Sequence, residues 1–239
     1  MKRWVIPDLH GCIKTLKALL ENQIKPDEND EIYFLGDYID RGPNPKGVLD
    51  YIMNMQDQGV KIFPLIGNHE EYILLALENE TQRKRKFFFF KERNKLLDEW
   101  VRSGGYTTLH SFGVNSVTEI PEKYIEWIKN LKFFYELDDY VLVHAGLNFY
   151  RKDPFEDHHA ILWTKSFTPE PEKIHNKTVI HGHVPVSLDF LKAVLADPSK
   201  KYIPLDTGCY HPDKPGMGVL VALELGSLDL KIQKNVENS

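Results

Sequence analysis

Short polar motifs follow apolar segments at several points of this chain, and this pattern constrains the fold more than any other feature. The motifs are DLHG at 8–11, GDYIDRG at 36–42, GNHE at 67–70, HAG at 144–146 and HGH at 181–183. Carboxylate oxygens mixed with imidazole nitrogens suit divalent ions such as Mn, Fe or Zn. The pattern therefore favours a metal site assembled from loops that are far apart in the sequence.

The first third of the chain alternates between expected strands and expected helices. The apolar pattern predicts strands at 3–6, 31–35 and 61–66, with helices at 13–21 and 48–55 between them. Strands separated by helices of this length pair in parallel through right-handed crossovers. Each of the first three motifs begins where a strand ends, which is the edge where open α/β sheets place their ligands.

The rest of the chain is expected to be helical first and richer in strands later. A helix at 70–80 leads into a mostly helical insertion around 81–135. Further strands are predicted at 140–143, 178–180, 202–205, 219–225 and 228–232, the last two as a hairpin around Gly226-Ser227. These elements predict an α/β (α+β) fold, and 239 residues are expected to form one domain, residues 1–239.

Composition excludes several classes of protein. The net charge of −5 disfavours a stable nucleic-acid complex, and no apolar run is long enough for a membrane helix. Cys12 and Cys209 are too few and too far apart for a disulfide framework or a thiolate zinc site. Met1-Lys2-Arg3 leads directly into a strand, so we expect no signal peptide and a cytoplasmic protein. The oligomeric state stays open.

The motif residues predict a site for two metal ions. Asp8 and His10 alternate and would face the same side of an extended segment, and Asp37 can offer one oxygen to each of two ions about 3.5–4 Å apart. The residues available for the second ion are Asn68, His144 and His183. Two ions that share a water lower its pKa to about 7, which favours in-line hydroxide attack on a phosphate ester.

Three neighbouring residues fit the same reaction. His69 can protonate a departing alkoxide as general acid, and Asp40 can hold its imidazole and raise its pKa. Arg41 offers a planar fork that matches two phosphate oxygens.

The motifs resemble the GDxHG, GDxxDRG, GNHE, HxG and GH steps of the phosphoprotein-phosphatase branch of the calcineurin-like metallophosphoesterases, in particular its small bacterial and phage-type members. The resemblance implies two packed mixed sheets flanked by helices, and two divalent ions per chain, with Mn as the first expectation and Fe or Zn as alternatives. It implies Asp8, His10 and Asp37 on one ion, with Asp37, Asn68, His144 and His183 on the other. It also implies Arg41 on phosphate and the pair of Asp40 and His69 as leaving-group acid.

Two positions depart from the family pattern. Pro7 stands where the family has glycine, which removes a backbone donor. Lys165 stands two residues after Trp163, where bacterial members place an arginine on the substrate phosphate, and lysine supplies charge without the bidentate fork. Tyr210 is a further candidate for the substrate cleft.

The expected function is hydrolysis of phosphoserine or phosphothreonine in proteins, with a phosphoprotein or phosphopeptide as substrate. The first alternative is a dinucleoside-tetraphosphate hydrolase, a class that usually lacks the second aspartate of GDxxDRG and carries GNHD. Asp40 and Glu70 therefore favour the phosphoprotein substrate. A phosphodiesterase and a non-catalytic phosphoprotein-binding module are weaker alternatives.

Other polar residues are interpreted as structural. The basic and aromatic stretch Arg83–Lys91 is interpreted as a solvated helix whose aromatics cover the domain, with attraction of acidic phosphopeptides as an alternative. His181 is expected in the core or behind the ligands, and His158, His159 and His175 are expected on the surface.

Overall fold

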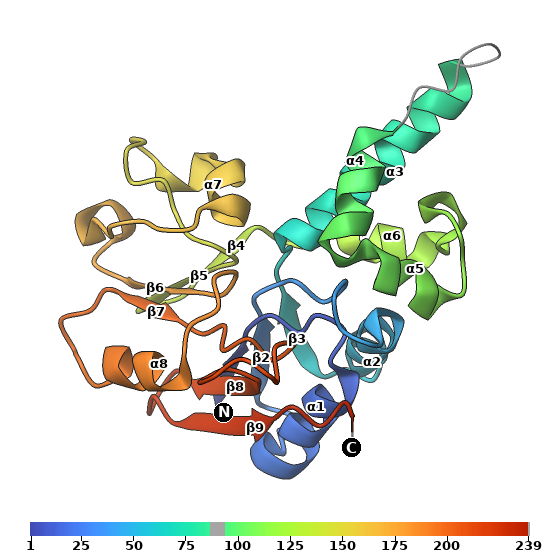
Figure 1. Ribbon diagram of the computed structural model, residues 1–239. Helices are drawn as coiled ribbons and strands as arrows, with labels where there is room; N and C mark the ends of the chain where they lie inside the picture. The colour runs from blue at the N-terminus through green and yellow to red at the C-terminus, as the bar shows by residue number, and fades with distance from the viewer. Residues whose placement is uncertain (87–93, 239) are drawn as a thin grey trace.

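A computed structural model of the protein describes residues 1–86 and 94–238. The side chains of 83–93 lie outside the described residues, and with them those of the basic stretch Arg83–Lys91. The first sheet has the strand order β3-β2-β1-β8-β9 (Figure 1). Its strands are β1 (Arg3–Ile6), β2 (Glu31–Phe34), β3 (Lys61–Pro64), β8 (Val219–Glu224) and β9 (Leu230–Lys234). β1, β2 and β3 pair in parallel as expected, while β8 joins β1 in the antiparallel direction.

The second sheet has the strand order β4-β5-β6-β7. Its strands are β4 (Phe134–Glu136), β5 (Tyr140–Val143), β6 (Thr178–His181) and β7 (Tyr202–Pro204). β5, β6 and β7 are parallel, and β4 is an antiparallel edge strand. Both sheets are therefore mixed, which confirms the expected fold.

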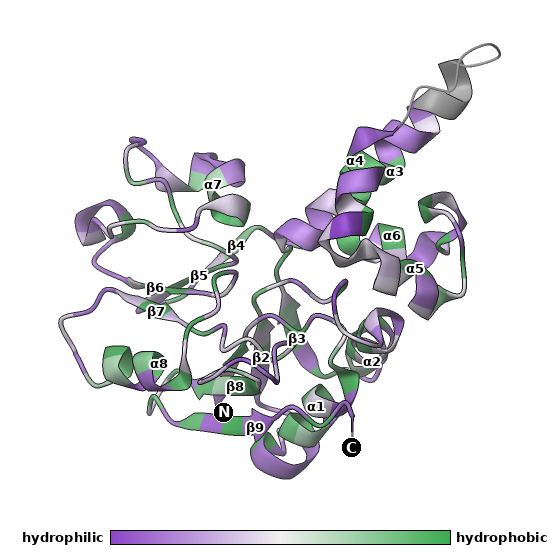
Figure 2. Ribbon diagram, viewed as in Figure 1, coloured by the Kyte–Doolittle hydropathy of each residue, from purple (hydrophilic) through white to green (hydrophobic). Residues whose placement is uncertain are grey.

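Side-chain alternation explains how the two sheets pack. Val5 and Tyr33 of the first sheet are buried in one cluster with Leu142 and Ile180 of the second. The neighbour of Val5 on β1, Ile6, points the other way into the cluster formed with the helices. The first sheet is thus covered on both faces, and three of the four residues of β1 and of β2 are buried. β9 at the edge of this sheet is partly hydrophilic (Figure 2).

Helices surround the sheets, and two of them project as an arm. The helices are α1 (Ile13–Ala18), which continues as a π-helical turn over Leu19–Ile24, α2 (Pro45–Asp57), α3 (Asn68–Lys86), α4 (Lys95–Trp100), α5 (Tyr106–Phe112), α6 (Glu122–Lys129), α7 (His158–Trp163) and α8 (Leu188–Leu195). α3 and α4 run side by side in the arm at the upper right of Figure 1. Asn44 caps the start of α2, because its side chain accepts the Gly47 N–H. Proline follows it as the first residue of the helix.

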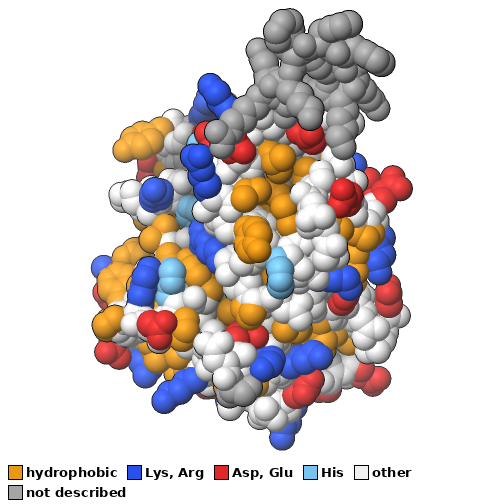
Figure 3. Space-filling view, turned by 45° about the vertical axis from the view of Figure 1, so that its right-hand side comes forward, with side chains coloured by type: hydrophobic (Ala, Val, Ile, Leu, Met, Phe, Trp, Pro, Cys, Tyr) orange, Lys and Arg blue, Asp and Glu red, His pale blue; other side chains and the backbone are white. Residues whose placement is uncertain are grey.

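Charged side chains of both signs are interspersed on the face shown in Figure 3. Within the described residues, none of the helices is both long enough and apolar enough to cross a bilayer.

The turn between β8 and β9 depends on an ionised carboxylate. Glu224 accepts hydrogen bonds from the backbone N–H and the hydroxyl of Ser227, both at 2.7 Å. Burial opposes the charge, but these hydrogen bonds outweigh it and lower the pKa of Glu224 to about 2.

Because the folded pKa is depressed, the stabilisation is present above the unfolded pKa of about 4.3 and is lost as the pH falls through about 2. We expect Glu224→Gln to lower the free energy of unfolding by about 2 kcal/mol at pH 7, with a difference from wild type that shrinks between about pH 5 and pH 2. Urea unfolding of both chains in EDTA measures this difference. A difference independent of pH would assign the effect to packing instead.

Candidate metal centre

The first two motif loops are tied together by backbone hydrogen bonds at the carboxyl ends of β1 and β2. The N–H groups of Leu9 and His10 both donate to the carbonyl of Asp37, at 3.0 and 2.8 Å. Gly11 donates to Tyr38 at 2.9 Å. The two loops therefore form one unit, which brings their side chains to the same edge of the sheet.

Several motif residues adopt a left-handed backbone that non-glycine residues rarely adopt. The φ angles are +41° at His10, +53° at Asp37, +68° at Asp40, +63° at Arg41 and +67° at His183. Such conformations cost about 1–3 kcal/mol each and persist where the surrounding structure over-determines them. Their concentration in the motif loops indicates that the fold is strained here in order to aim these side chains.

Asp37 lies between two groups of histidines. Its Oδ2 is 3.3 Å from Nε2 of His10, and its Oδ1 is 3.5 Å from Nε2 of His144. Burial opposes its charge, but the neighbouring histidines, His144 first, hold the pKa of Asp37 well below its usual range. An ionised carboxylate with one oxygen toward each group is the geometry that a bridging ligand of two cations requires.

Backbone carbonyls fix both imidazoles. Nδ1 of His10 lies 2.8 Å from the Ile39 carbonyl, and Nδ1 of His144 lies 2.9 Å from the Leu35 carbonyl. Burial lowers the pKa of both histidines. A neutral ring that donates through Nδ1 carries its lone pair on Nε2, so both rings present a ligand atom toward Asp37.

A second group of ligand atoms meets Oδ1 of Asn68, the first residue of α3. Nε2 of His144 and Nδ1 of His183 each lie 2.9 Å from this oxygen, and the two nitrogens are 3.2 Å apart. Burial lowers the pKa of His183 to about 3. Lone pairs that converge at this spacing in a buried place fit a divalent cation.

Asp8 connects the two sheets, because it follows β1 of the first sheet and binds the loop after β6 of the second. Both of its oxygens accept the N–H of His183 at 3.1 Å, and Gly182 leaves no room for a Cβ beside Oδ1. Burial, then the charges of Asp206 and Asp37, raise the pKa of Asp8 well above its usual value. Among the described residues, the groups whose ligand atoms lie close enough for one ion are His10–Asp37–His69 and Asp37–His144–His183. Asp8 lies beside these groups rather than within one of them.

Asp40 and His69 form a buried pair. Nδ1 of His69 lies 2.6 Å from Oδ2 of Asp40, and the same oxygen accepts Nε1 of Trp100 at 2.9 Å. Thr108 donates to the other oxygen at 2.5 Å. Burial opposes a charge on the ring, but the charge of Asp37 and the hydrogen bond and charge of Asp40 outweigh it and raise the pKa of His69. The pair has the geometry of a proton donor held by a carboxylate.

Arg41 is exposed at the rim, and Tyr210 holds it. Its Nη1 lies 2.7 Å from Nε2 of His10 and from the Tyr210 hydroxyl, and its Cζ lies 4.8 Å from the centre of the tyrosine ring. The structure thus brings two of the three expected substrate-binding residues, Arg41 and Tyr210, to the site. Lys165 is exposed on the loop after α7. No hydrogen bond or ion pair in the described part of the chain joins Lys165 to the motif residues.

Glu70 clamps two of the motif loops. Its two oxygens accept the backbone N–H groups of Gly67, Asp37, Tyr38 and Ile39 at 2.8–3.2 Å. The last residue of GNHE therefore fixes the loop that carries Asp37. A shorter aspartate, with one methylene fewer, would have to move closer to reach the same four donors.

Asp206 is a buried residue of the site that sequence reasoning missed. It follows β7, which pairs in parallel with β6, and lies next to the loop after β6 that carries His183. Its Oδ1 accepts the Gly208 N–H at 2.8 Å, whereas Oδ2 is buried and has no hydrogen-bond partner among the described residues. Burial, with the charge of Asp37, raises the pKa of Asp206 to about 7. An orphaned carboxylate oxygen near Asp8 and Asp37 fits the second shell of a cation site.

We expect Asp206→Asn to stabilise the metal-free protein and weaken its metal binding. Asparagine keeps the acceptor for Gly208 and removes a repulsive charge, so the Tm in EDTA should rise by about 3 °C. Metal affinity should fall about 10- to 100-fold. Calorimetric unfolding with and without Mn²⁺ measures both, and Asp30→Asn, a buried aspartate elsewhere, is the control. A lower Tm in EDTA with unchanged affinity would give Asp206 a structural role only.

Curated proteins are similar to part of this chain. A symmetrical bis(5'-nucleosyl)-tetraphosphatase of Nitrosospira multiformis is 23% identical over 149 residues, which are 62% of this chain and 44% of that protein. The same enzyme of Pseudomonas fluorescens is 32% identical over 108 residues, which are 43% of this chain and 36% of that protein. The chain thus spans less than half the length of these relatives.

Solved structures share the fold at low identity. One, provisionally described as a diadenosine tetraphosphatase, has a TM-score of 0.65 at 16% identity and covers 99% of this chain and 94% of its own. A serine/threonine phosphatase of Saccharomyces cerevisiae has a TM-score of 0.64 at 14% identity, with 99% and 81% covered. The sequence itself matches the calcineurin-like phosphoesterase family over residues 1–214. The chain therefore belongs to this family of metal-dependent hydrolases.

Proposed function

We propose that this protein hydrolyses dinucleoside tetraphosphates at a two-metal centre and releases two nucleoside diphosphates. The curated relatives support this substrate class, which the sequence motifs alone placed second. Asp40 and Glu70 favoured a phosphoprotein substrate, but the contacts of Glu70 are all with the backbone of the site, so its identity bears on loop geometry rather than on substrate.

The observation that most directly supports hydrolase activity is the position of Asp37, whose two oxygens face separate histidines. His10 and Asp37, with Asp8 beside them, would hold one divalent ion, and Asp37, Asn68, His144 and His183 the other, with Mn, Fe and Zn all compatible with these ligands. When bound, such ions neutralise phosphate charge and activate water. Arg41, held by Tyr210, would bind phosphate oxygens at the exposed side. His69 would donate a proton to the leaving oxygen through Nε2.

Phosphoserine and phosphothreonine in proteins are the second candidate substrates. The buried pair of Asp40 and His69 favours them, because a departing seryl alkoxide is far more basic than a departing diphosphate and needs a proton donor more. The contacts of Trp100 and Thr108 with Asp40 hold this donor in place.

A comparison of two substrates tests the order of these candidates. The Mn-loaded protein is given diadenosine tetraphosphate or a phosphothreonine peptide, and the two kcat/KM values are compared. We expect the higher value for the dinucleotide, with ADP as its only nucleotide product. A higher value for the peptide would reverse the order, and ATP with AMP as products would contradict symmetrical cleavage.

A further inference from the structure

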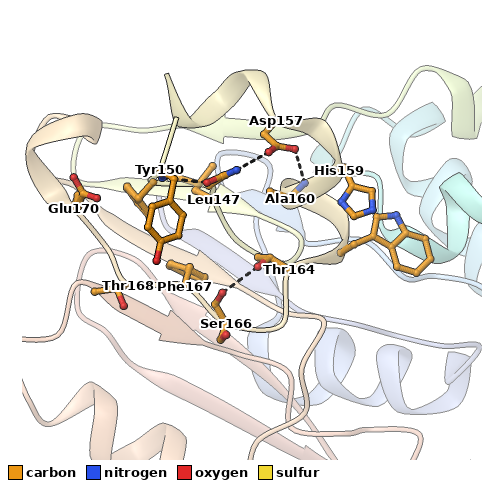
Figure 4. Close-up of a pocket in the computed structure, with 13 residues that line it drawn as sticks. Leu147, Tyr150, Asp157, His159, Ala160, Thr164, Ser166, Phe167, Thr168 and Glu170 are labelled. Atoms are coloured by element: carbon orange, nitrogen blue, oxygen red, sulfur yellow. Dashed lines mark hydrogen bonds between the residues drawn. The ribbon is translucent and has the colours of Figure 1, made fainter. Parts of the chain in front are cut away.

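A pocket of about 560 Å³ lies next to the loop that carries His144 (Figure 4). It is formed by residues 147–150, which follow that ligand, and by residues from α7 and the segment after it. Its volume is within the range of about 300–1,000 Å³ that is typical of small-molecule sites. None of the catalytic groups described above lines it.

Aromatic rings form much of its wall. Phe149 and Phe167 are stacked with their centres 6.0 Å apart, and His159 and Trp163 are stacked at 6.4 Å. Tyr150 is 100% exposed at the pocket, in the labelled view of Figure 4. Phe149 is buried, whereas Tyr150 is exposed and Trp163 and Phe167 are partly exposed, so these three rings leave surface available for a flat ligand.

The wall is fixed to both sides of the metal centre. Gly146 leaves no room for a Cβ against Phe167, whose ring also contacts the ring of His181 at 5.2 Å. Nε1 of Trp163 donates to Glu71 at 2.5 Å, two residues after His69. Leu147 is three residues from His144, so the pocket begins within about 11 Å of that ligand along the chain.

The lining offers little positive charge to a phosphate. Asp157 and Glu170 are paired with cations outside the lining, Arg151 at 3.9 Å and Lys173 at 3.0 Å, and the described residues that line the pocket include neither lysine nor arginine. The hydroxyls of Ser166 and Thr168 lie at the exposed rim, where they offer donors and acceptors. The pocket thus suits an uncharged, flat, polar-edged group, while phosphates would go to Arg41 and the metal ligands.

We propose that this pocket binds one nucleobase of the dinucleotide, stacked on its aromatic wall, while the phosphates occupy the metal centre. This inference rests on the proposed function, because it assigns to the pocket the base of that substrate. Stacking of a base on an aromatic side chain is worth about 1–3 kcal/mol, or roughly 5- to 150-fold in binding.

Base-free inorganic tetraphosphate separates the pocket from the metal centre. The measured quantity is kcat/KM for diadenosine tetraphosphate divided by kcat/KM for inorganic tetraphosphate, with Mn²⁺. We expect Phe167→Ala and Tyr150→Ala to lower this ratio about 10-fold or more. Phe190→Ala, on α8 and 46% exposed, is the matched aromatic control and should keep the wild-type ratio. A wild-type ratio in both pocket variants would overturn the inference and leave the proposed function standing.

Adenosine provides a test that needs no turnover. Saturation-transfer NMR should show contact between adenosine and the wild-type protein, with the signal lost in Phe167→Ala. If adenosine binds in this way while diadenosine tetraphosphate is not hydrolysed, the base site stands and the proposed function fails. If adenosine does not bind and the dinucleotide is not hydrolysed, both fail.

Discussion

Asp37→Asn should remove turnover and weaken binding of both metal ions together. Asparagine tolerates the left-handed backbone at this position, where φ is +53°, and keeps the shape of the side chain. It lacks the charge and one of the two oxygens that face His10 and His144. Changes in second-shell residues alone lower metal affinity about 10- to 100-fold, so we expect more than about 100-fold for this ligand.

Metal analysis after dialysis, together with kcat on an aryl phosphate, measures this effect. Asp50→Asn, which alters an exposed aspartate paired with Lys46 on α2, is the control and should keep both ions. An Asp37→Asn protein that retains two tightly bound ions would show that Asp37 does not bridge them.

His69→Asn should lower kcat sharply while the metal content persists. A positioned general acid contributes about 10²- to 10⁴-fold, and Asp40 holds Nδ1 of His69, so the proton would be donated from Nε2, which lies 4.0 Å from Oδ2 of Asp37. The size of the loss should depend on the leaving group. It should be largest for a phosphothreonine peptide and smallest for p-nitrophenyl phosphate, whose leaving group needs no proton.

Asp40→Asn should lower kcat less than His69→Asn does. The loss should again be largest for the phosphothreonine peptide and smallest for p-nitrophenyl phosphate. The hydrogen bonds of Asp40 with Trp100 and Thr108 join it to the insertion, so the Tm must be measured alongside kcat. Equal losses on all leaving groups would refute the general-acid role. Loss of a metal ion in His69→Asn would instead make His69 a ligand, since it lies within ligand distance of His10 and Asp37.

The strands that carry the metal motifs could be predicted well from the sequence. Apolar runs bounded by polar motifs gave β1 and β5 with the observed bounds, and β2, β3 and β6 within two residues. The two-sheet fold is confirmed, although it came from the family resemblance rather than from periodicity. α7 and α8 were not predicted because both are short, although each begins after a capping side chain, Asp157 and Ser187 respectively.

Contacts between distant segments could not be predicted. Trp100 lies 60 residues from Asp40, and no local pattern links its indole to that carboxylate. No local pattern assigns a role to Asp206, and its orphaned oxygen becomes visible once β7 is placed beside β6. The aromatic pocket likewise needs Phe149 and Phe167, which come together only through the fold of residues 147–170.

The central claim is that one buried carboxylate, Asp37, joins two cation sites. Titration of the metal-free protein with Mn²⁺, followed by calorimetry and electron paramagnetic resonance on the same sample, tests it most directly. We expect two ions per chain and an exchange-coupled signal, because ions bridged by one carboxylate lie about 3.5–4 Å apart. One ion per chain, or two ions with uncoupled signals, would contradict the claim.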